Sequence, residues 1–327
     1  IRDSYYCDKE QRNKFIELLW YKKLVPMLPS KNHTNVFSEP ELFGIIENMV
    51  NLLSDFKKSI FFYCKSNRLL KYILPIAKSL KEKVVIISFE ELEENLNDCD
   101  HIQILEIGII KRINPNSRGY IKEKYPFHFF VSYTFDQLIQ VLHPKSVVFV
   151  EGCHYDSELF SAVCKKYSVP TLCLHHGWPA LIHTRFINMG YDYYITWGRH
   201  FVNLWKIYNP CIKFIDAGYL GEISTNTKSK SGIAFFFQGP LFIIDEKLIK
   251  LMADFAIHCA TKYSNRIIYI RQHPEFRLSR TIINTMVQLP NIQFVDNLKI
   301  SELFSYSLIG DGVFSTTLIE GLAHDTI

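Results

Sequence analysis

Several features that would place this 327-residue chain in other classes of protein are missing from its sequence. Its apolar runs fall well short of the ~18 to 20 residues that a membrane-spanning helix needs. The polar and aromatic residues after Ile1 lack the basic start and apolar stretch of a secretory signal. We therefore expect a cytoplasmic chain that does not cross a bilayer.

The sequence also lacks the usual signs of a metal site or a nucleic-acid surface. Its eight cysteines include no CxxC pair, the short spacing at which zinc sites commonly present thiolates. No Asp-x-Asp pair is suited to magnesium. The net charge of +4 is modest, and the basic residues do not form one dense stripe, which argues weakly for an anionic ligand and against nucleic acid.

What the sequence does contain is the alternation typical of α/β proteins. From Ser59 onward, short β-branched or aromatic runs alternate with longer stretches of helical period, as in a parallel sheet wrapped by helices. The polar segment 221–232 has the composition of a flexible linker. We expect an N-terminal helical cap over 1–58, a Rossmann-like domain over 59–222 and a second one over 223–327, the two domains facing a cleft.

The pattern also predicts individual elements. In the first domain we expect strands over 60–64, 84–88, 127–131, 147–150 and 171–174, with helices over 68–80 and 157–167. In the second we expect strands over 233–237, 267–270, 292–295 and 308–309, with helices over 246–261, 279–287 and 301–306.

Polar residues follow five of these strands, where open parallel sheets bind their ligands. The first domain contributes an acceptor-side set: Glu151, Gly152, His154, His175, His176 and Gly177. The second domain contributes a nucleotide-binding set: Gln238, Gly239, Arg271, His273, Pro274, Gly310, Ser315, Thr316, Thr317 and Glu320. Each motif alone is common in turns and helix caps, but their joint occurrence at five strand exits favours a functional site.

The residue types suggest roles in sugar-nucleotide chemistry. Gly239 lets backbone amides approach a phosphate, and the hydroxyls of 315–317 with their helix N-terminus form an anion site. His273, beside Arg271 and aimed by Pro274, can donate to the same phosphate or to the leaving oxygen. Glu320 is placed to accept hydrogen bonds from ribose hydroxyls.

A general base is also needed to take a proton from an acceptor hydroxyl. Both Glu151 and His176 can do so, and the residues leave that choice open.

The motifs resemble those of a known family. RQHPEF (271–276), SELFSYSLIGD (301–311) and STTLIEGLAHDTI (315–327) are similar to the donor-binding half of GT-B enzymes that build bacterial capsules and lipopolysaccharide. In that family a HisPro motif and a Ser/Thr-rich motif bind the nucleotide, commonly CMP in sialyl and Kdo transferases. The resemblance covers 147–327, and it implies that His273, Pro274, Ser315 and Thr316 hold the nucleotide.

The first domain resembles the family in two ways that imply different bases. The stretch LHHGWPAL (174–181) is similar to a loop of teichoic-acid polymerases that use CDP-glycerol, which implies that His176 is the base. In bacterial sialyltransferases an acidic residue before glycine is the base, and Glu151 with Gly152 matches only the second part of that motif.

The expected function is transfer of sialic acid or a related acidic sugar from a CMP-activated donor to a glycan or lipid-linked acceptor in surface polysaccharide synthesis. It needs no metal and no cofactor beyond the donor, and a lipid-linked acceptor would bring the protein to the inner face of the cytoplasmic membrane. Three alternatives stay open: a transferase of polyol phosphate from CDP-glycerol or CDP-ribitol, a non-catalytic scaffold, and a sugar-nucleotide epimerase.

Overall fold

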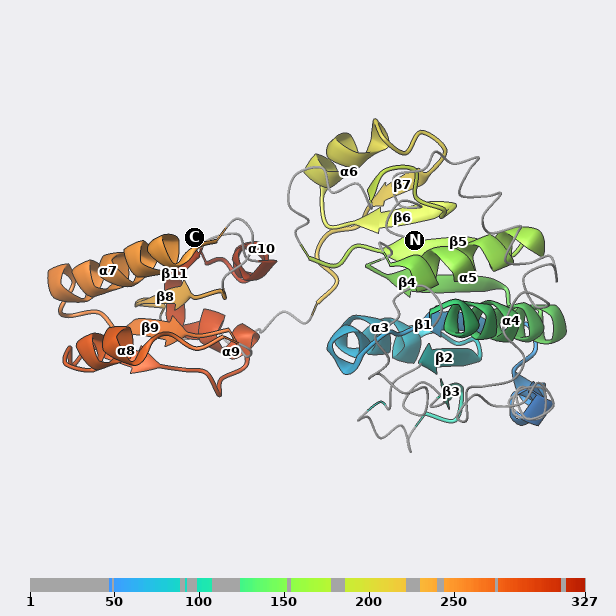
Figure 1. The fold of residues 1–327 in the computed structure, drawn as a ribbon, viewed down its shortest axis with the longest axis horizontal. Helices are drawn as coiled ribbons and strands as arrows, with labels where there is room; N and C mark the ends of the chain where they lie inside the picture. Colours follow the sequence, from blue (N-terminus) through green and yellow to red (C-terminus); the bar gives the residue numbers. More distant parts are fainter. Residues whose placement is uncertain are drawn as a thin grey trace. The chain divides into compact units, whose positions relative to one another are not determined.

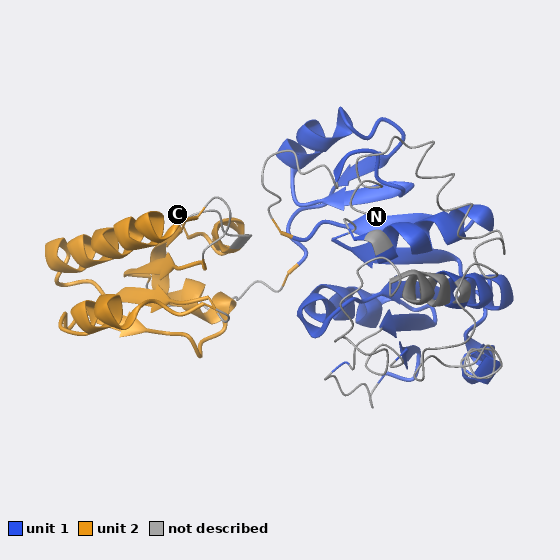
Figure 2. Cartoon of the chain, viewed as in Figure 1, with its two compact units in different colours: residues 1–176, 181–220 blue, residues 177–180, 221–327 orange. Residues whose placement is uncertain are grey.

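The computed structural model describes residues 47–48, 50–88, 92, 99–107, 124–151, 154–177, 186–221, 230–239, 244–273, 276–312 and 316–326. Most of the expected N-terminal cap, residues 1–46, therefore lies outside the described residues. The chain divides into two compact units, with the main change of unit between Leu220 and Gly221 (Figure 2).

The first unit is built on a seven-stranded sheet in which every pair of neighbouring strands is parallel (Figure 1). The strands are β1 (Ile60–Tyr63), β2 (Val84–Ser88), β3 (Ile102–Glu106), β4 (Ser146–Val150), β5 (Thr171–Leu174), β6 (Tyr193–Thr196) and β7 (Lys213–Asp216). The helices are η3 (Ser54–Phe56), α3 (Asn67–Ser79), α4 (Lys124–Leu142), α5 (Tyr155–Lys166) and α6 (Arg199–Lys206). The spatial order is β3-β2-β1-β4-β5-β6-β7, so the order reverses between β1 and β4.

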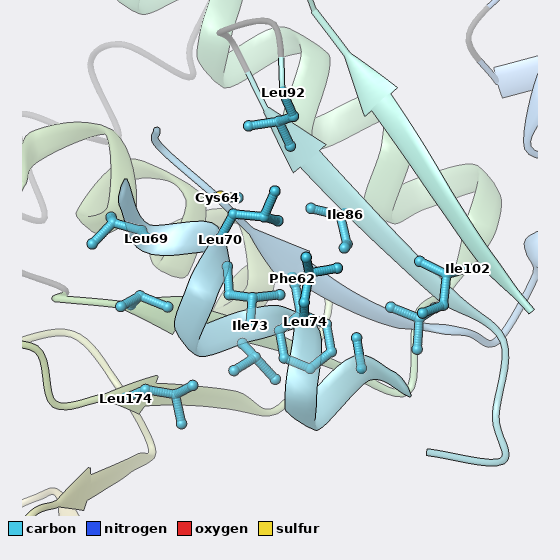
Figure 3. Close-up of a cluster of buried hydrophobic side chains, with 14 residues drawn as sticks. Phe62, Cys64, Leu69, Leu70, Ile73, Leu74, Ile86, Leu92, Ile102 and Leu174 are labelled. Atoms are coloured by element: carbon cyan, nitrogen blue, oxygen red, sulfur yellow. The ribbon is translucent and has the colours of Figure 1, made fainter. Parts of the chain in front are cut away.

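One face of this sheet packs against α3. Successive strand residues point to opposite faces, so Phe62 and Ile86 share a face and meet Leu70 and Ile73 of the helix (Figure 3). All four side chains are at most 4% exposed. The apolar spacing of α3 thus sets the helix over the β1 and β2 half of the sheet, and its first turn follows the end of β1 directly.

The opposite face carries an aromatic cluster. Tyr63 and Phe149, on neighbouring central strands, both pack edge to face against Phe160 of α5. The ring centroid of Tyr63 lies 5.9 Å from that of Phe160 and 6.2 Å from that of Phe149. Phe135 of α4 stacks on Phe160 at 3.7 Å. Edge-to-face and stacked pairs add to the gain from area burial, so this cluster fixes α4 and α5 on the sheet.

The second unit is a smaller parallel sheet of four strands with the order β10-β9-β8-β11. Its strands are β8 (Gly232–Phe236), β9 (Ile268–Arg271), β10 (Ile292–Phe294) and β11 (Ser307–Gly312). Its helices are α7 (Glu246–Lys262), α8 (Arg280–Met286), α9 (Ile300–Tyr306) and α10 (Thr316–Ala323). Here the strand order reverses between β8 and β11.

Capping and burial explain where these elements lie. The side chains of Asp245 and Ser279 accept hydrogen bonds from the first turns of α7 and α8, which satisfies donors that a helix start leaves unpaired. Phe235 faces the α7 side of the sheet, while Phe236 faces Phe304 of α9 on the other. The sheet is therefore covered on both faces, as parallel sheets are.

The structure confirms the expected fold class of two Rossmann-like α/β domains and corrects several elements. The predicted strand over 127–131 is wrong, because these residues lie inside α4; a short apolar run alone does not separate a strand from a buried helix. The predicted strand over 308–309 is too short, because β11 continues to Gly312 along β8. Strands β3, β6 and β7 were not predicted.

In the part of the chain that the structure describes, no helix combines the length and the apolar character needed to cross a membrane.

The aromatic cluster makes a testable prediction about stability. Phe160 is fully buried and contacts three aromatic rings, so Phe160→Ala should lower the free energy of unfolding by about 3–5 kcal/mol. Phe255→Ala, at a ring 49% exposed on α7, should cost less than about 1 kcal/mol. Urea unfolding checks both, and equal losses would contradict the assigned packing.

Candidate functional site

The first unit offers a binding edge where its strand order reverses. In open parallel sheets, ligands bind beyond the carboxyl ends of the strands at such a reversal. Here the reversal lies between β1 and β4. The residues that follow these strands and the neighbouring β5 are Lys65, Glu151 and His176, so the edge places charged and imidazole side chains together.

Glu151 stands at this edge in a strained backbone conformation. Its φ is +72°, a left-handed value that non-glycine residues rarely adopt and that costs of order 1–3 kcal/mol unless its surroundings impose it. Its N–H donates to the carbonyl of Leu174 at 3.0 Å, and its own carbonyl accepts from the Tyr194 hydroxyl at 3.4 Å. Two neighbouring strands thus hold the residue in the geometry that aims its side chain.

Three side chains gather around that carboxylate, and together with Glu151 we call them the Glu151 cluster: Arg68, Glu151, His154 and His176. Nε2 of His154 lies 3.1 Å from Oε2 of Glu151, within hydrogen-bond distance. Nδ1 of His176 lies 3.7 Å from Oε1, and the Arg68 guanidinium is 4.0 Å from Oε2. The structure therefore joins three expected residues and adds Arg68, from the first turn of α3.

The electrostatics of the cluster keep Glu151 ionised. Burial alone would raise the pKa of its carboxyl, but the hydrogen bond from His154 and the nearby imidazole of His176 outweigh burial, and the net pKa lies far below the ordinary 4.5. A carboxylate with such a low pKa is a weak proton acceptor. Glu151 is therefore better suited to orient an imidazole than to act as the base itself.

The ring of His176 packs against Tyr72 and faces Glu151. Tyr72 of α3, which is 1% exposed, meets its ring edge to face at a centroid distance of 5.0 Å. Its Nδ1 is buried and, among the described residues, has no partner within hydrogen-bond range. Glu151 is the charged group that this nitrogen faces, so a small approach of the two side chains would complete a carboxylate–imidazole pair.

His175, expected on the acceptor side, lies instead in the core at 1% exposure. Its Nδ1 accepts from the N–H of Trp197 at 3.2 Å, and its ring packs among Trp197, Phe201 and Trp205. This environment gives His175 a packing role that anchors the backbone of the next residue, His176. Gly177 follows with φ +78°, which permits the turn, and Gly152 lies outside the described residues.

In the second unit, Gly239 after β8 and His273 after β9 each lie beside Phe276, a residue that was not among those expected. A Cβ on Gly239 would overlap the ring of Phe276, so only glycine lets the two loops touch here. Phe276 in turn lies beside His273, at a ring-centroid distance of 5.5 Å, and its N–H donates to the carbonyl of His273. We call Gln238, Gly239, His273 and Phe276 the Gly239 edge.

A polar network fixes the loop that carries His273. The Asp296 carboxylate accepts from the N–H and side-chain amide of Gln272 at 2.8 and 2.9 Å, and also pairs with Arg277. The side-chain amide oxygen Oε1 of Gln272 accepts from the N–H of Leu278 at 2.9 Å. These contacts hold the loop at both ends, and they could not be predicted from the sequence because Asp296 follows a different strand.

Arg271 contributes to the same framework. Its guanidinium donates to the backbone carbonyls of Val295 and Leu298, and burial lowers its pKa. These two bonds tie the end of β9 to the segment before α9. The contacts observed for Arg271 are thus with the protein backbone.

The remaining expected residues lie at or near the reversal between β8 and β11. Gly310 lies inside β11 and not in a loop after the strand, and a Cβ at this position would meet Phe236 and Thr326 at ordinary van der Waals distances. Helix α10 starts just beyond β11 and carries Thr317 and Glu320, of which Glu320 is 6% exposed. Pro274, Ser315 and the side chain of Thr316 lie outside the described residues.

No protein-family model and no curated protein matches this sequence. Solved structures do match the fold. A UDP-GlcNAc 2-epimerase from Neisseria meningitidis bound to UDP-GlcNAc aligns with a TM-score of 0.51 and 14% identity over 77% of this chain and 76% of its own. A putative UDP-N-acetylglucosamine 2-epimerase from Listeria monocytogenes aligns with a TM-score of 0.53 and 8% identity over 78% and 74%.

The wall teichoic acid polymerase TagF aligns with 12% identity over 88% of this chain and 78% of its own. Its TM-score of 0.46 is too low to support an argument about this chain. Identities of this size show the fold alone. The chain has the pair of Rossmann-like domains typical of GT-B proteins, and its chemistry must be argued from its own residues.

The low pKa of Glu151 makes a prediction about pH. A carboxyl whose pKa is depressed in the folded state stabilises the fold above its ordinary pKa of 4.5, and this contribution is lost as the pH falls below that value. Wild type should therefore lose more unfolding free energy between neutral and acid pH than Glu151→Gln does.

Urea unfolding across that range measures the difference. Glu246→Gln, on the exposed first turn of α7, is the matched control and should follow wild type. Parallel pH profiles for wild type and Glu151→Gln would contradict the ionised cluster.

Proposed function

We propose that this protein is a metal-independent glycosyltransferase that moves a sugar from a nucleotide donor to an acceptor hydroxyl. The finer proposal is a CMP-linked sialic acid or related acidic sugar as donor and a glycan or lipid-linked acceptor in surface polysaccharide synthesis. A lipid-linked acceptor would bring the protein to the inner face of the cytoplasmic membrane. The observation that carries the proposal is the position of the Glu151 carboxylate, 3.7 Å from Nδ1 of His176, at the reversal of strand order.

That pairing supports His176 as the general base. Glu151 faces Nδ1, which leaves Nε2 to take the proton of an acceptor hydroxyl, and the carboxylate stabilises the imidazolium that forms. The acceptor oxygen then bonds to the anomeric carbon, whose bond to the nucleotide phosphate breaks with the electron pair leaving on the phosphate. The weak basicity of Glu151 supports His176 as the base, of the two that the sequence left open.

The Gly239 edge supports the donor side of the proposal. Glycine at 239 lets a loop backbone come close to a ligand, and His273 beside it can donate to a leaving phosphate. The start of α10, at the neighbouring reversal of strand order, adds backbone N–H groups suited to an anion. CMP as the nucleotide rests on the resemblance of the HisPro and Ser/Thr motifs.

Two other activities are compatible with these residues. The similarity of the loop around His176 to CDP-glycerol polymerases favours polyol-phosphate transfer. Sugar-nucleotide epimerisation stays an alternative because it occurs on the same two-domain fold. A transferase needs an acceptor, whereas an epimerase converts UDP-GlcNAc without one. Incubation with CMP-sialic acid, CDP-glycerol or UDP-GlcNAc, with and without a glycan acceptor, separates the three.

Substitution of the proposed base gives a direct test. His176→Gln should lower turnover by about 10²- to 10⁴-fold, because a general base contributes that much, while the affinity for the nucleotide stays as in wild type. Steady-state kinetics with binding followed in parallel measure the two effects. His258→Gln, at an exposed position on α7, should keep full turnover; a fully active His176→Gln variant would rule out this base.

A nucleotide screen tests the donor. A ligand that binds only the folded state raises its melting temperature, so CMP should raise Tm more than CDP, UDP or GDP does. A larger shift with CDP would favour polyol-phosphate transfer, and a larger shift with UDP would favour the epimerase. No shift with any of the four would argue for a non-catalytic scaffold.

A further inference from the structure

Phe276 is an exposed aromatic side chain at a place where a ligand is expected. It is 40% exposed, although it is a large apolar residue, and it follows β9 in the same loop as His273. Its backbone pairs with His273 through a short antiparallel bridge. An apolar ring left open at the carboxyl edge of a parallel sheet is a typical element of a binding site.

The surroundings hold this ring in a defined position. On one side lies the backbone of Gly239, so close that a Cβ at that residue would overlap the ring. On another side lies His273, with its ring tilted by 43° to that of Phe276. The Gln272 and Arg277 bonds to Asp296 fix the loop on both sides of these residues. Ligand binding therefore costs little further conformational entropy of the loop.

We propose that Phe276 is the surface on which the base of the donor nucleotide stacks. The inference rests on the proposed nucleotide-dependent function. The ring centroids of Phe276 and His273 are 5.5 Å apart, so one nucleotide can reach both, with its base on the aromatic ring and its phosphate near the imidazole. Because every base has a π-face, stacking of this kind gives affinity without selecting between cytosine and uracil.

The same unit contains a matched control for this side chain. Phe255 on α7 is 49% exposed and touches Phe235 edge to face. It belongs to the middle of a helix and not to a strand exit. Phe255 and Phe276 therefore share residue type, domain and similar exposure but differ in location, which is the property under test.

Binding of three ligands to the full chain tests the proposal by isothermal titration calorimetry. CMP and UMP carry a base, whereas ribose 5-phosphate has the sugar and phosphate alone. In Phe276→Leu, CMP and UMP should each bind about tenfold more weakly, equal to about 1.4 kcal/mol, and ribose 5-phosphate should bind as in wild type. Phe255→Leu should bind all three as wild type does.

A second variant gives a readout if Phe276→Leu does not fold. Phe276→Trp keeps an aromatic face, so CMP should bind with near wild-type affinity and quench the new indole fluorescence, while ribose 5-phosphate should leave it unchanged. Equal CMP affinity in wild type and Phe276→Leu, or no quenching in Phe276→Trp, would overturn the stacking role and leave the proposed function standing. Equal weakening of all three ligands would also overturn it, because the ring would then support the phosphate loop.

If wild type binds neither CMP nor UMP, the stacking role and the proposed donor site fail together, which distinguishes that result from the others.

Discussion

The parallel pairing of strands, with one reversal of order in each sheet, determines what the rest of this molecule can do. Helices that connect parallel strands must cover both faces, so the faces are closed by packing. In such sheets ligands bind at the carboxyl edge, where the connections separate at the reversal of strand order. In the first unit that point lies between β1 and β4, and in the second between β8 and β11. The polar residues of the Glu151 cluster and of the Gly239 edge lie at these points.

The two edges are prepared in different ways. Charge is concentrated at the Glu151 cluster. A carboxyl group whose pKa lies far below its ordinary value faces two imidazoles and a guanidinium. At the Gly239 edge, the carboxylate of Asp296 is hydrogen-bonded to Gln272 and so stabilises the loop that carries His273 and an aromatic ring. The first arrangement suits proton transfer, whereas the second suits recognition of a flat, anionic molecule.

Sequence reasoning located the edges better than it assigned individual side chains. Glu151, His154 and His176 could be grouped because each follows a strand or lies one short turn beyond it, and strand exits in parallel sheets converge. Arg68 and Tyr72 were missed because they belong to a helix, and only packing of α3 on the sheet brings them to the cluster.

Errors in the sequence interpretation arose where one pattern fits two structures. Two adjacent histidines look equivalent in the sequence, yet neighbouring residues of an extended chain point in opposite directions, and His175 enters the core. The run 127–131 is equally apolar as a strand or as part of a buried helix, and it proved to be helical. Such ambiguities are resolved by tertiary contacts, which local patterns do not contain.

Glu151 combines a left-handed backbone with a charged side chain, and these two properties favour different residues. Glycine or asparagine would adopt that conformation at lower cost, but neither carries a charge. At neutral pH this backbone cost opposes the stabilisation that the ionised carboxylate gains from His154 and His176. In acid the carboxylate is protonated and only the backbone cost remains, so the balance at residue 151 then moves toward glycine.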